Sequence, residues 1–131
     1  MRTYLVDGTN AVRRGAFDPR FPAVEESRTE AFLLKVEALA AEAADRLRIE
    51  IFFDGPRRSM PVRPGMPVRL RFAADGDADA AILGSARRLL NDGRGVVVVT
   101  EDSGLAADVR AEGGRTMRPA EFITRLGEGK A

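Results

Sequence analysis

The chain has 131 residues, of which 44% are hydrophobic and 31% are charged, and its formal net charge is +1. This length is typical of one domain with its own core, so we expect a single domain over residues 1–131. The sequence has no apolar run near the ~20 residues of a membrane helix, and Asp7 interrupts the N-terminal segment where a signal peptide would be apolar. We therefore expect a soluble, cytoplasmic protein.

Two absent residue types restrict the chemistry further. The chain contains no histidine and no cysteine. A Ser-His-Asp triad, a thiol nucleophile and a zinc site built from histidine or cysteine are therefore excluded. Catalysis by this chain would have to use carboxylates, lysine, tyrosine or a bound hard cation.

The N-terminal third predicts a strand, a loop, a helix and a second strand. Residues 3–6 favour a strand that ends at Asp7, and the glycine and prolines of residues 11–25 predict a loop with room for one helical turn. Ser27 and Glu30 have the spacing of a capping box. Apolar residues that repeat every three to four positions behind them predict an amphipathic helix over 28–47. Residues 48–53 predict the second strand.

The middle of the chain is basic. Four prolines predict a stiff loop over residues 55–67, and alternating apolar and arginine residues predict a strand at the sheet edge over 68–72. Between residues 55 and 74 there are five arginines and no acidic residue. Such an acid-free stretch is typical of a surface that binds a polyanion, although charged residues also protect an edge strand from pairing with other edges.

The remaining elements alternate between helix and strand. A helix that Asp77 or Asp79 begins is predicted to reach residue 90, and four consecutive valines over 96–99 predict a strand buried on both faces. A helix over 104–112, a strand over 115–117 and a terminal helix from residue 119 follow. This alternation predicts an α/β fold, a three-layer α/β/α sandwich with a mainly parallel central sheet.

Aspartates occur at the predicted carboxyl ends of the strands, where ligands bind in such sheets. They are Asp7, Asp54, Asp75, Asp77, Asp79 and Asp102. Clustered carboxylates repel one another unless a cation bridges them, and Mg²⁺ or Mn²⁺ prefers such oxygen ligands. A cation held there can promote hydrolysis of a phosphodiester without histidine. The alternative is that these aspartates only cap helices and turns.

The sequence excludes three other kinds of site. Ala80 and Ala86 stand where an EF-hand loop needs glycine and glutamate. Thr9 stands where a phosphotransferase with an aspartyl nucleophile needs a second acid. The chain also lacks the glycine-rich P-loop of nucleotide-binding folds.

Five segments resemble, in order, the motifs of NYN domains in the PIN-like nuclease superfamily, and most closely the bacterial YacP-like group. They are LVDGTN at 5–10, FFDG at 52–55, DADAAI at 77–82, VVTEDSGL at 98–105 and RPAEF at 118–122. The resemblance implies a PIN-like fold and a metal-dependent endoribonuclease that cleaves single-stranded RNA with Mg²⁺ or Mn²⁺. Its implied partner is RNA, and the ribosome is a candidate partner.

The resemblance also implies roles for individual residues. Asp7, Asp79 and Asp102 would bind the metal, and Asn10 would orient a ligand or a metal-bound water. Asp54 and Asp77 are further candidate metal ligands, with a helix cap as the alternative for Asp77. The expected catalytic residues are thus Asp7, Asn10, Asp79 and Asp102.

RNA contacts are expected from residues close to the same sheet edge. They are Arg13, Arg14, Arg57, Arg58, Arg63 and Thr100. Ala80 and Ala106 stand where many NYN domains and some relatives have a further acid, and Glu101 stands where serine is usual. Two alternatives therefore stay open: an RNA-binding module that has lost cleavage activity, and a small-molecule phosphohydrolase that uses the same acidic edge.

Overall fold

A computed structural model of the chain describes residues 1–13, 18–60, 62 and 65–131. Its sheet has five strands in the order β3-β2-β1-β4-β5, and every neighbouring pair is parallel. The strands are β1 (Arg2–Asp7), β2 (Leu47–Asp54), β3 (Val68–Ala73), β4 (Val96–Val99) and β5 (Arg115–Met117). The predicted α/β class is confirmed, and β3 is an edge strand as the alternation of apolar residues and arginines indicates.

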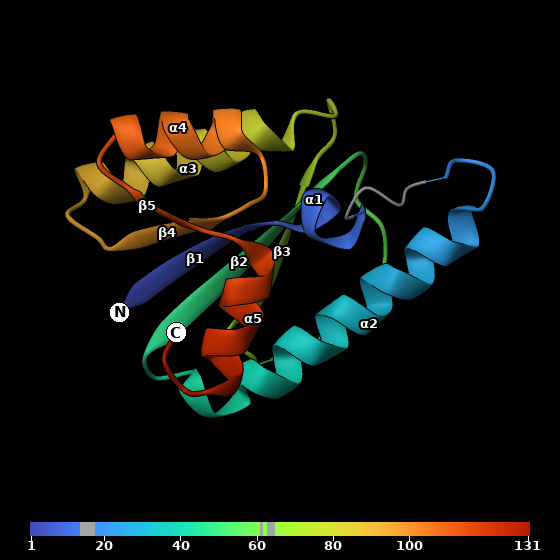
Figure 1. Cartoon of the computed structure of the whole chain (residues 1–131), viewed down its shortest axis with the longest axis horizontal. Helices are drawn as coiled ribbons and strands as arrows, with labels where there is room; N and C mark the ends of the chain where they lie inside the picture. Colours follow the sequence, from blue (N-terminus) through green and yellow to red (C-terminus); the bar gives the residue numbers. More distant parts are fainter. Residues whose placement is uncertain (14–17, 61, 63–64) are drawn as a thin grey trace.

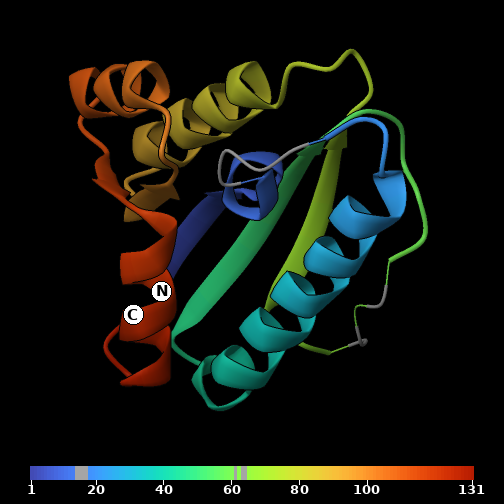
Figure 2. The same ribbon diagram turned by 45° about the vertical axis from the view of Figure 1, so that its right-hand side comes forward.

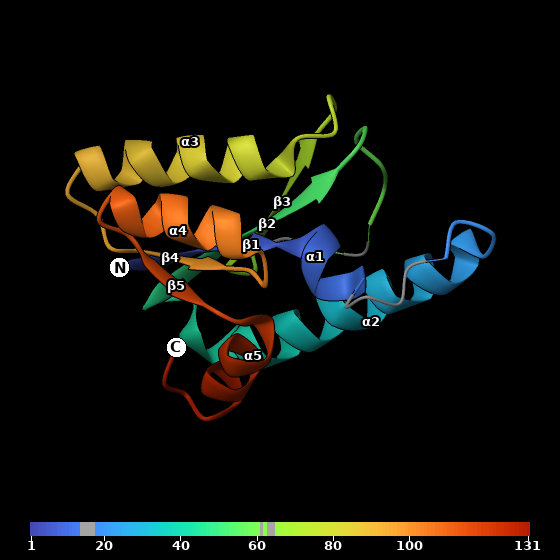
Figure 3. The ribbon, with the colours of Figure 1, turned by 45° about the horizontal axis from the view of Figure 1, so that its top comes forward.

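Helices cover both faces of this sheet. They are α1 (Gly8–Arg13), α2 (Pro22–Ala40), α3 (Ala78–Asn91), α4 (Ser103–Ala111) and α5 (Pro119–Gly127), with a short 3₁₀ helix η1 (Ala41–Ala43) after α2. Helices α3 and α4 lie over one face, and α2 and α5 lie over the other (Figures 1 and 3). The chain therefore has the predicted three-layer sandwich. Among the described residues, no helix is long and apolar enough to cross a bilayer.

The predicted start of the long helix is wrong. Helix α2 begins at Pro22, six residues before the predicted start, and Ser27 lies inside it rather than capping it. Proline suits the first helical position because the N–H it lacks would have no partner there. The predicted end at residue 47 is wrong as well: α2 ends at Ala40, η1 follows it, and Leu47 already belongs to β2, where it pairs with Arg2 of β1.

The predicted loop over residues 11–25 is also only partly correct. Helix α1 occupies Gly8–Arg13, directly after β1, and α2 takes over from Pro22. Residues 14–17 lie outside the described part of the chain. The short helix α1 sits at the carboxyl end of β1, with its axis seen nearly end-on in Figure 2.

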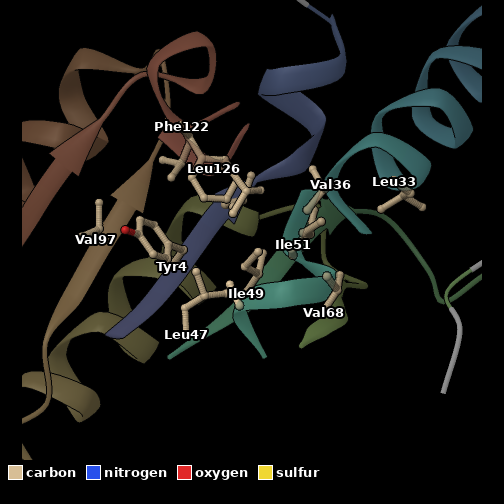
Figure 4. Close-up of a cluster of buried hydrophobic side chains, with 14 of the residues drawn as sticks. Tyr4, Leu33, Val36, Leu47, Ile49, Ile51, Val68, Val97, Phe122 and Leu126 are labelled. Carbon is tan, nitrogen blue, oxygen red and sulfur yellow. The ribbon is translucent and has the colours of Figure 1, made fainter. Parts of the chain in front are cut away.

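Alternation along β2 divides the core into two clusters. Leu47, Ile49 and Ile51 belong to the cluster on the side of α2 and α5, together with Leu33 and Val36 of α2 (Figure 4). Phe52, which follows Ile51 and points to the other face of the sheet, belongs to the cluster on the side of α3. All four valines of β4 are buried, which confirms the prediction of a strand covered on both faces.

Candidate active site

The carboxyl ends of the strands open into an acidic cleft of about 680 Å³. Its lining residues come from β1, α1, β2, α3, the β4–α4 turn and the start of α5, and they are Asp7, Thr9, Asn10, Arg13, Asp54, Asp79, Glu101, Asp102, Pro119 and Ala120. Parallel strands end at one edge of a sheet, which is why residues far apart in the sequence meet here. Four of the five predicted metal ligands line this cleft; Asp77 does not.

Three of these carboxylates also cap helices. Oδ1 of Asp7 accepts a hydrogen bond of 3.2 Å from a backbone N–H in α1, and Oδ1 of Asp102 accepts one of 3.0 Å in α4. Oδ1 of Asp54 accepts one of 3.0 Å from the first residue of α3. The caps fix the direction of each carboxylate and use one of its two oxygens. The capping interpretation and the ligand interpretation are therefore compatible at these positions.

Thr100 supports Asp7 from below the cleft. Its hydroxyl donates to Oδ2 of Asp7 at 3.2 Å, and Oγ1 of Thr100 accepts a hydrogen bond from the backbone N–H of Asp102 at 3.0 Å. Thr100 is buried, with 4% of its surface exposed. It therefore holds the carboxylate of Asp7 and the backbone of Asp102 in position, and its side chain does not reach the surface where an RNA contact was expected.

Burial and mutual repulsion change the acidity of two cleft carboxyls. Burial raises the pKa of Asp7 to about 6, and the negative charge of Asp79 adds to this, while hydrogen bonds from Asn10 and Thr100 oppose it. The pKa of Asp79 is raised by desolvation and then by the charges of Asp102 and Asp54. The cleft thus carries negative charge that its protein partners do not neutralise.

A divalent cation fits this donor set only in part. Among the described residues, no group of three or more acidic side chains is arranged to hold one ion directly. Asp79 and Asp102 form an acidic pair whose side chains share a hydrogen bond. Mg²⁺ is commonly held by one or two carboxylates and several waters, so this pair meets that need. Asp77 is exposed and caps α3 through a 2.9 Å hydrogen bond from Ala80.

The expected RNA-binding arginines occupy different places. Arg13 lines the acidic cleft and forms an ion pair with Glu25. Arg58 donates to the backbone oxygen of Asp54 at 3.2 Å, and its guanidinium lies over an aromatic ring of β3, Phe72, at 5.5 Å from the centroid.

The other expected arginines lie further from the acidic cleft or cannot be placed. Arg57 is exposed in a separate hollow that it shares with Arg58. Arg14 and Arg63 lie outside the described residues.

A side groove of about 520 Å³ extends the acidic cleft toward α2. The groove and the cleft share Thr9, Arg13 and Asp54, and Arg58, beside Asp54, also lines the groove. Together they form a continuous concave surface that joins the carboxylates of the cleft to Arg13 and Arg58, with Glu25 and Glu26 of α2 in the groove as well. This continuity suits a chain-like ligand better than a compact one.

Reasoning from the sequence missed two polar residues of the cleft. Thr9 accepts a 3.0 Å hydrogen bond from the backbone N–H of Asp54, which ties β2 to α1. Glu101 donates its backbone N–H to Oδ1 of Asn10 at 2.8 Å, which ties the β4–α4 turn to α1. Both lie within the quoted motifs at 5–10 and 98–105, so membership of those motifs was the available signal.

Comparison with solved structures finds the same fold in another protein. No family model matches the chain, and no curated protein matches it by sequence. A crystal structure of Rae1 (YacP) from Bacillus subtilis matches with a TM-score of 0.72 at 20% identity, covering 98% of this chain and 75% of that one. A single-substitution mutant of the same protein matches with a TM-score of 0.70 at 21% identity, covering 98% and 76%.

The fold and the site define an α/β protein whose parallel sheet has an acidic cleft at its carboxyl edge. More particularly, the chain has the YacP-like NYN fold that its five motifs predict.

Proposed function

We propose that this chain is a metal-dependent endoribonuclease that cleaves single-stranded RNA with Mg²⁺ or Mn²⁺ held at Asp7, Asp79 and Asp102. The observation that carries the proposal is the acidic cleft, where carboxylates of four elements meet and burial and mutual repulsion raise the pKa values of Asp7 and Asp79. A bound cation would relieve that repulsion. The fold it shares with Rae1 (YacP) supports the same class.

Some residues of the cleft would hold the cation, and others orient the residues that would hold it. Asp79 and Asp102 form the acidic pair that would hold the cation, and Asp7 adds a third carboxylate fixed by its helix cap and by Thr100. When bound, a divalent cation would supply a water that ionises near neutral pH and a positive charge at the leaving oxygen. Asn10 keeps the β4–α4 turn, and with it Asp102, against α1.

The RNA would follow the side groove to the acidic cleft. Arg13 lines both, and Arg58 lines the groove beside Asp54. A guanidinium can bind a phosphate through two parallel hydrogen bonds and can stack on an unpaired base. Arg57 lies beyond Arg58 on the exposed loop and would extend the contact to one further phosphate.

A specific observation also supports the second candidate, an RNA-binding module without cleavage. The described residues include no trio of carboxylates arranged to hold one ion. Ala80, the residue after Asp79, supplies no additional ligand. The third candidate, a small-molecule phosphohydrolase, is less well supported because the cleft continues into the side groove.

Cleavage of a fluorescent, unstructured RNA oligonucleotide, with Mn²⁺ or with EDTA, tests the proposal. Loss of residues that merely orient metal ligands costs about 10–100-fold, so Asp79→Asn and Asp102→Asn should each reduce the rate at least about 100-fold. Calorimetric titration with Mn²⁺ should show weaker binding by both variants. The matched control is Asp108→Asn, at an exposed position of the same helix that Asp102 caps.

Each alternative has its own outcome. Full activity in EDTA, or in both variants, refutes the metal-dependent nuclease. RNA binding without cleavage by the parent protein supports the binding module. Hydrolysis of p-nitrophenyl phosphate without RNA cleavage supports the phosphohydrolase.

A further inference from the structure

A second large concavity lies at the opposite, amino-terminal edge of the sheet. This arginine hollow has a volume of about 810 Å³. Its lining residues are Met1, Thr3, Arg48, Ile49, Glu50, Met66, Pro67, Val68, Arg69, Leu89, Gly93, Arg94 and Gly95. In Figure 1 the starts of β1 and β2 and the α3–β4 turn lie on the left, and α1, which marks the acidic cleft, lies on the right. Six residues of β2 separate Arg48 from Asp54, a distance of roughly 20 Å.

Strand alternation brings two of the arginines to the same face. Ile49 and Val68 pack into the core cluster beside α2. Their neighbours Arg48 and Arg69 therefore project from the opposite face, on the side of α3. The register pairs Arg69 of β3 with Glu50 of β2, which lies two residues after Arg48. Arg48 and Arg69 are therefore on adjacent strands in the same part of the sheet.

The third arginine comes from the turn between α3 and β4. The backbone N–H of Arg94 donates to the oxygen of Leu89 at 2.9 Å. Gly93 before it adopts a φ of 75°, a conformation that suits glycine. The turn thus has a fixed backbone that carries Arg94 to the rim of the hollow. The three guanidinium groups come from three separate elements.

The charge of this hollow is not balanced. Within the described part of the chain, no carboxylate forms an ion pair with Arg48, Arg69 or Arg94. Glu50 is the acidic residue of the lining, and it is already paired with Arg71 at 2.9 Å. Three unpaired positive charges around one concavity repel one another and would be stabilised by an anion.

The arrangement favours one kind of anion. A guanidinium binds phosphate oxygens through two parallel hydrogen bonds. A volume of about 810 Å³ falls within the usual range for a small-molecule pocket. A nucleic-acid backbone is usually bound by basic residues along an extended groove, whereas these three surround a single hollow. We propose that the arginine hollow binds a chain of linked phosphates, free or as part of a nucleoside triphosphate.

Calorimetric titration in EDTA with tripolyphosphate and with ATP tests this site without involving the metal of the acidic cleft. The triple variant Arg48→Ala, Arg69→Ala, Arg94→Ala should bind both at least about tenfold more weakly than the parent. The matched control is Arg87→Ala, Arg115→Ala, Arg125→Ala, which removes three exposed charges from α3, β5 and α5. Its affinity should stay within about twofold of the parent.

The two ligands distinguish the sources of the phosphate chain. Equal affinities for tripolyphosphate and ATP would show that the phosphates alone are recognised, and tighter binding of ATP would show that the nucleoside contributes. If the two triple variants lose affinity equally, or the parent binds neither ligand, the proposal is overturned. The same holds if the hollow variant instead loses affinity for a single-stranded RNA without terminal phosphates, because that result identifies a backbone-binding site.

Two further measurements keep the test independent of stability and of the proposed nuclease. Should the triple variant fail to fold, Arg94→Gln in the exposed turn replaces it and should weaken tripolyphosphate binding by at least about threefold. The hollow variant should cleave a short RNA at the parent rate, since the acidic cleft is roughly 20 Å away. The proposed phosphate-binding hollow and the proposed nuclease activity can therefore be refuted independently of each other.

Discussion

Asp7→Asn should stabilise the metal-free protein. Asp7 is buried, and its pKa of about 6 lies above the ordinary value of 3.8 because burial and the charge of Asp79 disfavour the ionised form. The stability contributed by this group is therefore fully present below 3.8 and is lost as the pH rises to about 6. Asparagine removes the charge, and its side-chain oxygen can still cap α1.

The size of the effect follows from the two pKa values. The difference from 3.8 to about 6 corresponds to about 3 kcal/mol of unfolding free energy at pH 8. Replacing an oxygen by NH₂ opposite the Thr100 hydroxyl should cost about 1 kcal/mol. The net gain is then about 2 kcal/mol, or roughly 6–8 °C in Tm for a domain of this size. At pH 5 the gain should be smaller by about 1.4 kcal/mol, because Asp7 is then mostly protonated.

Urea unfolding in EDTA at pH 8 and at pH 5 measures both values. Asp45→Asn, at an exposed position before β2, is the matched control and should change stability by less than about 0.5 kcal/mol at either pH. With Mn²⁺ at pH 8, the parent should gain stability and Asp7→Asn should gain little. A variant that is no more stable than the parent at pH 8, or whose advantage is the same at both pH values, would refute the reasoning.

Substitutions at three positions, Thr100, Gly8 and Asp102, test the residues that support the site. Thr100→Val removes the hydroxyl that stabilises the ionised form of Asp7, so the acidic limb of the pH–rate profile should move to higher pH, and urea unfolding should show a loss of about 1–3 kcal/mol. Gly8→Ala would bring a Cβ within 2.9 Å of a backbone oxygen of β2 and should cost about 1–3 kcal/mol, whereas Gly84→Ala, with open space around it in α3, should be neutral or stabilising. Asp102→Asn should keep the cap of α4 and bind Mn²⁺ more weakly than the parent. Asp102→Ala should bind Mn²⁺ equally weakly and also lose about 1 kcal/mol of unfolding free energy, because alanine cannot cap the helix. If both variants bind Mn²⁺ as tightly as the parent, Asp102 is not a metal ligand.

The sheet could be predicted from the sequence because each strand has a pattern that burial requires. Residues 48–53 and 96–99 are covered on one or both faces by helices, and their apolar residues follow that coverage. The start of α2 could not be predicted in the same way. Only local sequence signals mark where this helix begins, and proline both breaks helices and suits their first position. Pro22 can therefore be assigned to the first position only when the structure around it is known. Helix α1 was missed for a related reason, since six residues are too few to show a helical period.

The candidate site could be predicted from topology rather than from local pattern. Parallel strands direct their last residues to one edge, so an aspartate at each strand end could be assigned to the same cleft before any contact was known. The sequence posed capping and ligation as alternatives because both use the same residue at the same position. The structure shows that they need not compete: a carboxylate has two oxygens, and at Asp7, Asp54 and Asp102 the cap uses Oδ1. Capping then orients the carboxylates, and it does so through helices whose N-terminal ends all approach the cleft and partly offset its negative charge.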